Sequence, residues 1–199
     1  MGRVALLLLM LSAAQTCLGQ SCEDDPYNSL QDSNCSFNDT VEQWWGEGLS
    51  HWPGEGHSCP GGAAHIDSQT SAHGQWGRIT RCVDTSPDQV VIAGLWVQPI
   101  VGTDYLCHLS VNEYGRENCE SRLLLGESTT LEVTKPTESF EELQVALMTS
   151  EMTQSFTFGL SCMDLGGFEL LVDDAYVIES EKILVDPFEQ TDQCAPQSQ

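Results

Sequence analysis

Glycine and proline recur so often in this chain that little room is left for helices, and its apolar residues fall in short β-branched or alternating runs. Turn-forming clusters separate these runs, at Pro53-Gly54, Pro60-Gly61-Gly62, Ser86-Pro87-Asp88, Tyr114-Gly115 and Gly166-Gly167. The pattern predicts strands near residues 35–37, 63–67, 77–84, 89–98, 104–113, 121–125, 129–133, 139–149, 154–162 and 168–179. Many short strands at this spacing are typical of an all-β sandwich or barrel.

One segment, residues 139–150, fits two structures. As a helix it would place Phe140, Leu143 and Leu147 on one face. As a strand it would carry on one face the side chains of Phe140, Glu142, Gln144 and Ala146. Its position directly before another predicted strand favours β structure.

The N-terminus has the three regions of a secretory signal peptide: Arg3, an apolar run over residues 4–11, and small or polar residues up to Gly19. The apolar run is shorter than the roughly 20 residues that span a bilayer. We therefore expect a secreted, extracellular protein cleaved after Gly19. The mature chain would have a polar arm over 20–33, one domain over 34–182 and a polar tail over 183–199.

Removal of the signal takes away Cys17 and leaves an even set of cysteines: Cys22, Cys35, Cys59, Cys82, Cys107, Cys119, Cys162 and Cys194. An even number in an exported protein predicts a disulfide framework. No C-x-x-C pair is present, and no histidine lies at a matching spacing, so a zinc site is not indicated. The Tyr114-Gly115 turn suggests a hairpin closed by Cys107–Cys119. The remaining cysteines would pair as Cys22–Cys194, Cys35–Cys59 and Cys82–Cys162.

The chain is strongly acidic, with seven basic residues against 30 acidic ones and a net charge of −23. Such a surface repels nucleic acid and anionic membranes. After the signal, no apolar stretch is long enough to insert into a membrane. This charge is compatible with a neutral or cationic ligand, or with calcium. It is also explained without any ligand, as a charge that keeps the protein soluble.

Two predicted strands are unusual. Residues 90–97 are apolar on both faces, so this strand lies in the middle of the sandwich or has one face lining a groove. Residues 168–178 carry Asp173 and Asp174 in an otherwise apolar run. Two carboxylates there need a metal, a hydrogen-bond network or a sheet edge.

Three segments of the chain resemble the CenC-type carbohydrate-binding modules. Asn34-Cys35-Ser36-Phe37, followed by Trp45, is similar to their opening, residues 90–97 to their long central strand, and residues 169–177 to their closing strand with its apolar-Asp-Asp signature. The segments occur in the family's order and bracket nearly the whole domain. The resemblance implies a galactose-binding-like jelly roll of two antiparallel sheets.

The resemblance also implies a structural calcium where the first and last strands meet, with Asp173 or Asp174 as a ligand. The chain departs from the family at two positions in the opening segment. Cys35 replaces the usual glycine, and Asn38 replaces a glutamate that is a calcium ligand in many members.

Aromatic rings are the residues from which sugar-binding surfaces are built, because a pyranose ring stacks its C–H face on an indole. The chain has five tryptophans. Trp45 matches a strand-end tryptophan of the family and is expected in the core. The candidate ligand-binding rings are Trp44, Trp52, Trp76 and Trp96. Trp44, Trp52 and Trp76 are equally compatible with exposure for ligand binding and with burial in the core. The face that carries Trp96 is either a ligand groove or a covered outer face.

Catalytic patterns are weak. No G-x-S-x-G elbow occurs, and the five histidines match no zinc motif. We expect a secreted, non-enzymatic module that binds neutral glycans. The alternatives are an extracellular protein-interaction domain on the same sandwich and a glycan-active hydrolase, which would need two carboxylates about 5–10 Å apart in a cleft. N-glycosylation sequons occur at Asn34 and Asn38.

Overall fold

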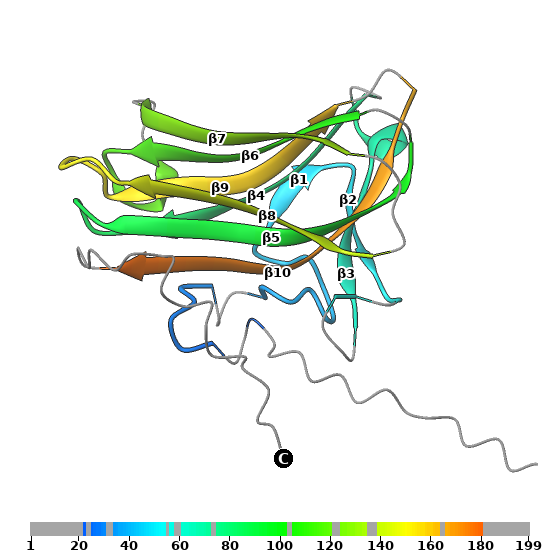
Figure 1. The fold of residues 1–199 in the computed structure, drawn as a ribbon, viewed down its shortest axis with the longest axis horizontal. Coiled ribbons are helices and arrows are strands. Elements are labelled where there is room, and N and C mark those ends of the chain that lie inside the picture. The colour runs from blue at the N-terminus through cyan, green and yellow to red at the C-terminus, as the bar shows by residue number, and fades with distance from the viewer. Residues whose placement is uncertain are drawn as a thin grey trace, which may run out of the picture.

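The computed structural model describes residues 22, 25–30, 34–54, 56–57, 61–72, 75–102, 105–120, 124–134, 139–163 and 166–180. Within these residues, ten strands form two antiparallel five-stranded sheets, which confirms the β-sandwich (Figure 1). The strands are β1 (Trp45–Glu47), β2 (Leu49–Trp52), β3 (Ala63–Asp67), β4 (Trp76–Asp84), β5 (Val90–Val101), β6 (Tyr105–Tyr114), β7 (Leu124–Thr134), β8 (Glu141–Met148), β9 (Ser155–Met163) and β10 (Glu169–Ser180). The described residues also include two short 3-10 turns, η2 (Ser68–Thr70) and η3 (Glu117–Cys119).

The first sheet has the strand order β1-β4-β9-β6-β7, and the second has β2-β3-β10-β5-β8. We call them sheet I and sheet II. Alternation along each strand sends one set of side chains into the space between the sheets and the other set outward. The inward set includes Val91, Ala93 and Leu95 of β5 and Phe156, Phe158 and Leu160 of β9, all fully buried.

Segment 139–150 forms the edge strand β8 rather than a helix, as expected. Its inward residues are Leu143 and Val145, and its outward residues are exposed. The predicted strand at 35–37 is wrong, because this segment bends, with Phe37 at a φ of 51°. The pattern did not predict β1 and β2, and the two strands expected at 121–125 and 129–133 are one strand, β7, beginning at Leu124.

The disulfides of the described residues are Cys22–Cys35, Cys82–Cys119 and Cys107–Cys162. All four predicted pairings are therefore wrong. Cys107 lies directly opposite Cys162 in the β6–β9 pair, so these two thiols meet across the sheet. Cys119 lies in η3, which packs against β4 and brings it to Cys82. Cys59 and Cys194 lie outside the described residues, as do the expected signal peptide and C-terminal tail.

The N-terminal arm is packed against the domain along β10 (Figure 1). Asn28 is buried and holds this contact: its amide nitrogen donates to the carbonyls of Cys22 and Ala175, and its Oδ1 accepts from the backbone of Leu30 and Val177. The Cys22–Cys35 disulfide fixes the start of the arm to the loop that precedes β1.

No helix among the described residues is long and apolar enough to cross a bilayer.

Candidate functional site

The outer face of sheet I carries two exposed tryptophans. Trp45 of β1 lies opposite Thr80 of β4, and Trp76 lies four residues earlier on β4 and on the same face. Their side chains are 43% and 45% exposed. At about 3.4 Å per residue, the two positions are roughly 14 Å apart along the sheet. Two rings therefore stand on one face at a separation that several linked sugars would span.

Charged side chains stand between the two rings. Glu47 of β1 and Arg78 of β4 are direct cross-strand partners, and Ser161 of β9 is the next residue across the sheet. Glu47, Arg78, Ser161 and Trp76 line a surface pocket of about 350 Å³. A side chain at Gly46 would strike the Arg78 backbone, and one at Gly77 would strike the Ile66 methyl and the Phe168 ring.

Glu47 and Arg78 are not paired with each other, although they face each other across the strands. The buried Oε2 atom of Glu47 has no hydrogen-bond partner within the described part of the chain. The exposed guanidinium of Arg78 forms no ion pair with any described residue. A buried polar atom without a partner costs about 1–3 kcal/mol. The pocket thus presents a carboxylate and an unpaired guanidinium beside an aromatic ring.

A turn before β1 decides which of the adjacent tryptophans faces outward. Gln43 adopts a φ of 70°, and Arg81 of β4 donates to both its backbone carbonyl and its side-chain oxygen. Partial burial lowers the pKa of the Arg81 guanidinium. The turn directs Trp44 into the sandwich and Trp45 out of it.

The structure reverses the expected roles of these two residues. Trp44 is only 7% exposed and packs on Phe37 and Phe158, with ring centroids 5.2 and 6.3 Å away. Its indole nitrogen donates to the Asn34 carbonyl. Trp44 therefore belongs to the core and cannot contact a ligand, whereas Trp45, expected in the core, is on the surface.

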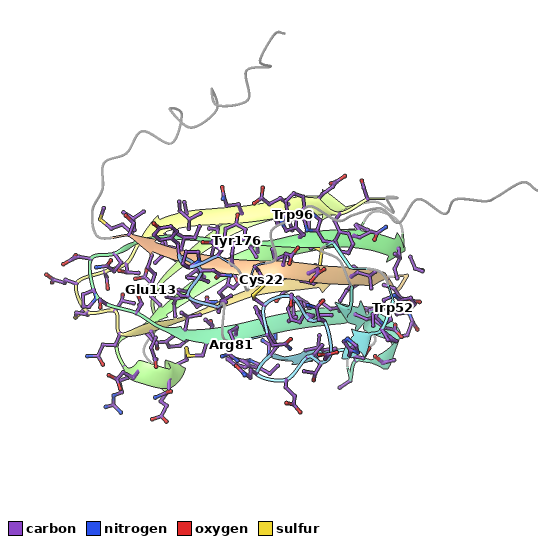
Figure 2. The ribbon with its side chains drawn as sticks, turned by 90° about the horizontal axis from the view of Figure 1, so that it is seen from below. Cys22, Trp52, Arg81, Trp96, Glu113 and Tyr176 are labelled. Atoms are coloured by element: carbon purple, nitrogen blue, oxygen red, sulfur yellow. A yellow bond between two sulfur atoms is a disulfide. The ribbon has the colours of Figure 1, made fainter. Side chains whose placement is uncertain are left out.

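Trp96 lies on the outer face of sheet II, together with Tyr176 (Figure 2). The imidazole of His57 stacks on its indole at 4.0 Å with an interplanar angle of 12°, and Phe140 packs on His57 in turn. The Tyr176 hydroxyl donates to Glu142, and burial, followed by Glu142, raises the Tyr176 pKa. His57 therefore covers the Trp96 ring. Trp52, at the end of the sandwich in Figure 2, is 39% exposed and belongs to the edge strand β2 of sheet II.

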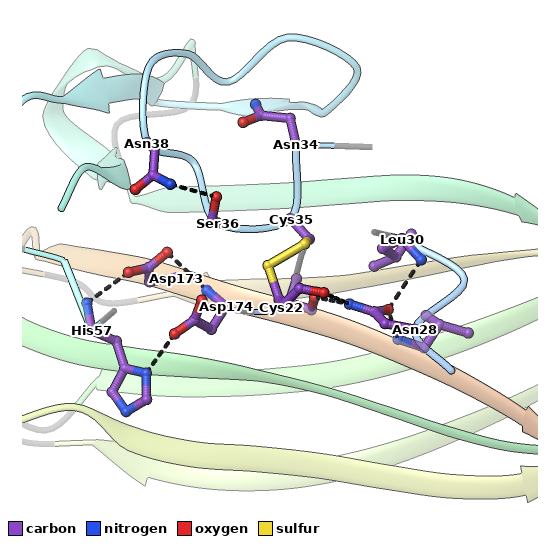
Figure 3. The surroundings of a disulfide bond; sticks show 12 residues. Cys22, Asn28, Leu30, Asn34, Cys35, Ser36, Asn38, His57, Asp173 and Asp174 are labelled. Atoms are coloured by element: carbon purple, nitrogen blue, oxygen red, sulfur yellow. Dashed lines mark hydrogen bonds and ion pairs between the residues drawn. A yellow bond between two sulfur atoms is a disulfide. The ribbon is translucent and has the colours of Figure 1, made fainter. Parts of the chain in front are cut away.

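Asp173 and Asp174 lie at a bulge in β10, where Asp174 has a φ of 44°. Both are buried. His57 binds both of them: its backbone N–H donates to Asp173 Oδ2 at 2.6 Å, and its Nδ1 lies 2.6 Å from Asp174 Oδ2 (Figure 3). Asn38 lies across from Asp173 in the same view, with its Nδ2 bonded to Ser36 and its buried Oδ1 without a partner among the described residues.

Sequence reasoning identified Trp76 and missed Trp45, Glu47, Arg78 and Ser161 as members of one face. A signal was present, because Trp45-Gly46-Glu47 and Trp76-Gly77-Arg78 both place a ring two residues before a charged side chain. In a strand, this spacing puts the ring and the charge on the same side.

No family model and no curated protein sequence matches this chain. Solved structures with similar folds include carbohydrate-binding modules. A family 61 module in complex with β-1,4-galactotriose aligns with a TM-score of 0.57 and 16% identity, over 77% of this chain and 99% of that one. The C-terminal family 22 module of Clostridium thermocellum Xyn10B aligns with a TM-score of 0.55 and 12% identity, over 75% and 93%. An enzymatically active tailspike domain of bacteriophage CBA120 also aligns, at 0.58 and 8%, although this chain covers only 22% of it.

Proposed function

We propose that this domain binds a neutral polysaccharide on the outer face of sheet I. The observation that carries the proposal is the pair of exposed rings, Trp45 and Trp76, with the unpaired Glu47 and Arg78 between them. Each ring would stack on a sugar, and a sugar hydroxyl would donate to Glu47 while another accepts from Arg78.

The charge of the protein favours a neutral ligand. Arg78 is the one cation among the four residues that line the described pocket, and Glu47 stands beside it. The net charge of −23 would repel an acidic glycan approaching this face. The likeness to the family 61 module solved with β-1,4-galactotriose supports a β-1,4-linked chain as the first ligand class to test.

The pocket supports binding rather than hydrolysis. Glycoside hydrolysis uses two carboxylates that flank the scissile bond, whereas the described residues that line this pocket include one carboxylate, that of Glu47. Stacking on separated rings, with a few hydrogen bonds between them, is instead a means of holding an extended chain.

The experiment is a tryptophan-fluorescence titration with xylohexaose, cellohexaose, mannohexaose and β-1,4-galactotriose. We expect single sugars to bind in the millimolar range and longer chains to bind more tightly, because both rings are then engaged. Trp76→Ala should weaken binding by about 5- to 150-fold, from roughly 1–3 kcal/mol per stacked ring. Met148→Ala, an exposed change on sheet II, is the matched control and should leave the affinity unchanged.

A flat titration across this panel, with the protein shown to be folded, would contradict the proposal and favour a protein-interaction domain. Equal binding by the wild type and Trp76→Ala would place any glycan elsewhere on the molecule.

We also propose a structural calcium ion beside Asp173 and Asn38. The buried carboxylate of Asp173 and the unpartnered Oδ1 of Asn38 supply hard oxygen ligands, which calcium prefers. Among the described residues no three His, Cys, Asp or Glu side chains come together as a metal site, so amide and backbone oxygens would complete the ligand set. A calcium ion there would join the loop before β1 to the bulge of β10.

A further inference from the structure

Trp52 is held in a fixed orientation although much of it is exposed. Its ring packs against His65 of β3, with the ring centroids 5.1 Å apart and tilted by 55°. On another side, the backbone at Gly54 approaches the indole so closely that any Cβ there would collide with Nε1 and Cδ1. The indole is thus fixed by its neighbours while 39% of the residue remains exposed. Such a ring can stack on a ligand without losing side-chain freedom.

The histidine that packs on this ring is itself held in place. His65 is held through both ring nitrogens: Nε2 lies 3.2 Å from Glu169 Oε2, and Nδ1 lies 3.4 Å from Ser50 Oγ. The side chains belong to three neighbouring strands of sheet II: Ser50 to β2, His65 to β3 and Glu169 to β10. Within the described residues, neither Glu169 Oε1 nor the Trp52 indole N–H forms a hydrogen bond. They can accept from and donate to ligand hydroxyls.

The Trp52 surface, formed by Trp52, Ser50, His65 and Glu169, faces away from the proposed glycan site. The chain crosses from sheet I to sheet II at Gly48, whose φ is 68°. Trp45 therefore lies on the outer face of sheet I, and Trp52 lies on the outer face of sheet II. The outer faces of two packed sheets point in opposite directions.

We infer that the Trp52 surface is a second glycan-binding site, and that the domain can hold two polysaccharide chains at once, one on each sheet. This inference rests on the proposed function for its ligand class, since it assumes that the same neutral glycans are bound. A rigid exposed ring beside a carboxylate and a donor is the same combination that Trp76, Glu47 and Arg78 provide on sheet I. Two sites on opposite faces make the domain a cross-linker of chains rather than a simple anchor.

The test uses the mature protein with the same four oligosaccharides and follows the indole N–H signals by nuclear magnetic resonance. Trp52→Ala and Trp76→Ala identify the two resonances. We expect the Trp52 and Trp76 signals to shift with separate saturation curves, and calorimetry to give a stoichiometry near two. Trp52→Ala should lower the stoichiometry to one and leave the Trp76 curve unchanged. With soluble xylan or β-glucan, the wild type should raise solution viscosity through cross-linking, and Trp52→Ala should not.

The outcomes separate this inference from the proposed function. If the wild type binds one glycan, and Trp76→Ala abolishes this binding while Trp52→Ala does not change it, the second site is overturned and the site on sheet I stands. Binding that Trp52→Ala abolishes and Trp76→Ala does not would support the Trp52 surface and overturn the site on sheet I. Because Trp52 is 39% exposed and lies on an edge strand, its variant should stay folded, with a melting temperature about 2–4 °C below that of the wild type at most. Trp52→Phe, which keeps a ring, should retain part of the second-site affinity.

Discussion

Replacing Trp44 or its neighbour Trp45 by alanine should have opposite consequences for this domain. Trp44 is 7% exposed, packs between Phe37 and Phe158, and donates a hydrogen bond to Asn34. Truncating a buried tryptophan leaves a cavity and costs about 3–5 kcal/mol. For a domain of this size, that loss lowers the melting temperature by about 6–20 °C.

Trp45 is 43% exposed, so its truncation should cost about 1 kcal/mol of stability or less. Its loss should instead remove one stacking ring and weaken oligosaccharide binding by about 5- to 150-fold. Urea denaturation of both variants measures stability, and fluorescence titration with the oligosaccharide panel measures binding. A destabilised Trp45→Ala together with a fully stable Trp44→Ala would refute the assignment of the two rings to surface and core.

Three further predictions follow from other parts of the molecule. Replacing Cys107 and Cys162 by serine should lower the free energy of unfolding by about 4 kcal/mol, because the bridge closes a loop between residues 55 positions apart. The midpoint of denaturant unfolding measures this loss, and an unchanged midpoint would contradict it. The folded protein raises the pKa of Tyr176 above its ordinary value of 10. The stability linked to the neutral hydroxyl is therefore fully present below pH 10 and is lost as the pH rises above it. Tyr176→Phe should therefore remove this alkaline loss, measured by urea unfolding between about pH 8 and pH 11. Chelation of calcium should lower the melting temperature of the wild type but not of Asp173→Asn, and equal melting with and without chelator would remove the proposed ion.

The fold could be predicted from the sequence because alternation and turn residues act locally. Residues 89–98 and 168–179 are expected as strands from their short apolar runs and the turns around them, and both form strands of sheet II, β5 and β10. The segment 35–37 failed because its apolar Phe37 is buried without being in a strand, at a backbone φ that strands do not adopt. The disulfides failed because pairing depends on which strands are neighbours, and β6 lies beside β9 as well as β7.

The candidate site was only partly predictable. Trp76 was identified, but a tryptophan's exposure depends on where its strand begins, and the turn at Gln43 that separates Trp44 from Trp45 depends on Arg81, 38 residues away. The Trp96 face shows the same limit. His57 covers the Trp96 ring because Asp173 and Asp174 hold His57 in place, and these two residues are more than 100 residues from His57 in the chain.

A glycan array probed with the wild-type protein and with a Trp45→Ala/Trp76→Ala variant, each with and without calcium, measures whether the outer face of sheet I binds polysaccharide. We predict that the wild type binds neutral β-1,4-linked chains, with a signal that grows with chain length, and that it does not bind acidic glycans. The folded double variant should lose most of this signal. Equal signals from the wild type and the double variant, or a preference of the wild type for acidic glycans, would contradict the claim that the outer face of sheet I binds neutral polysaccharide.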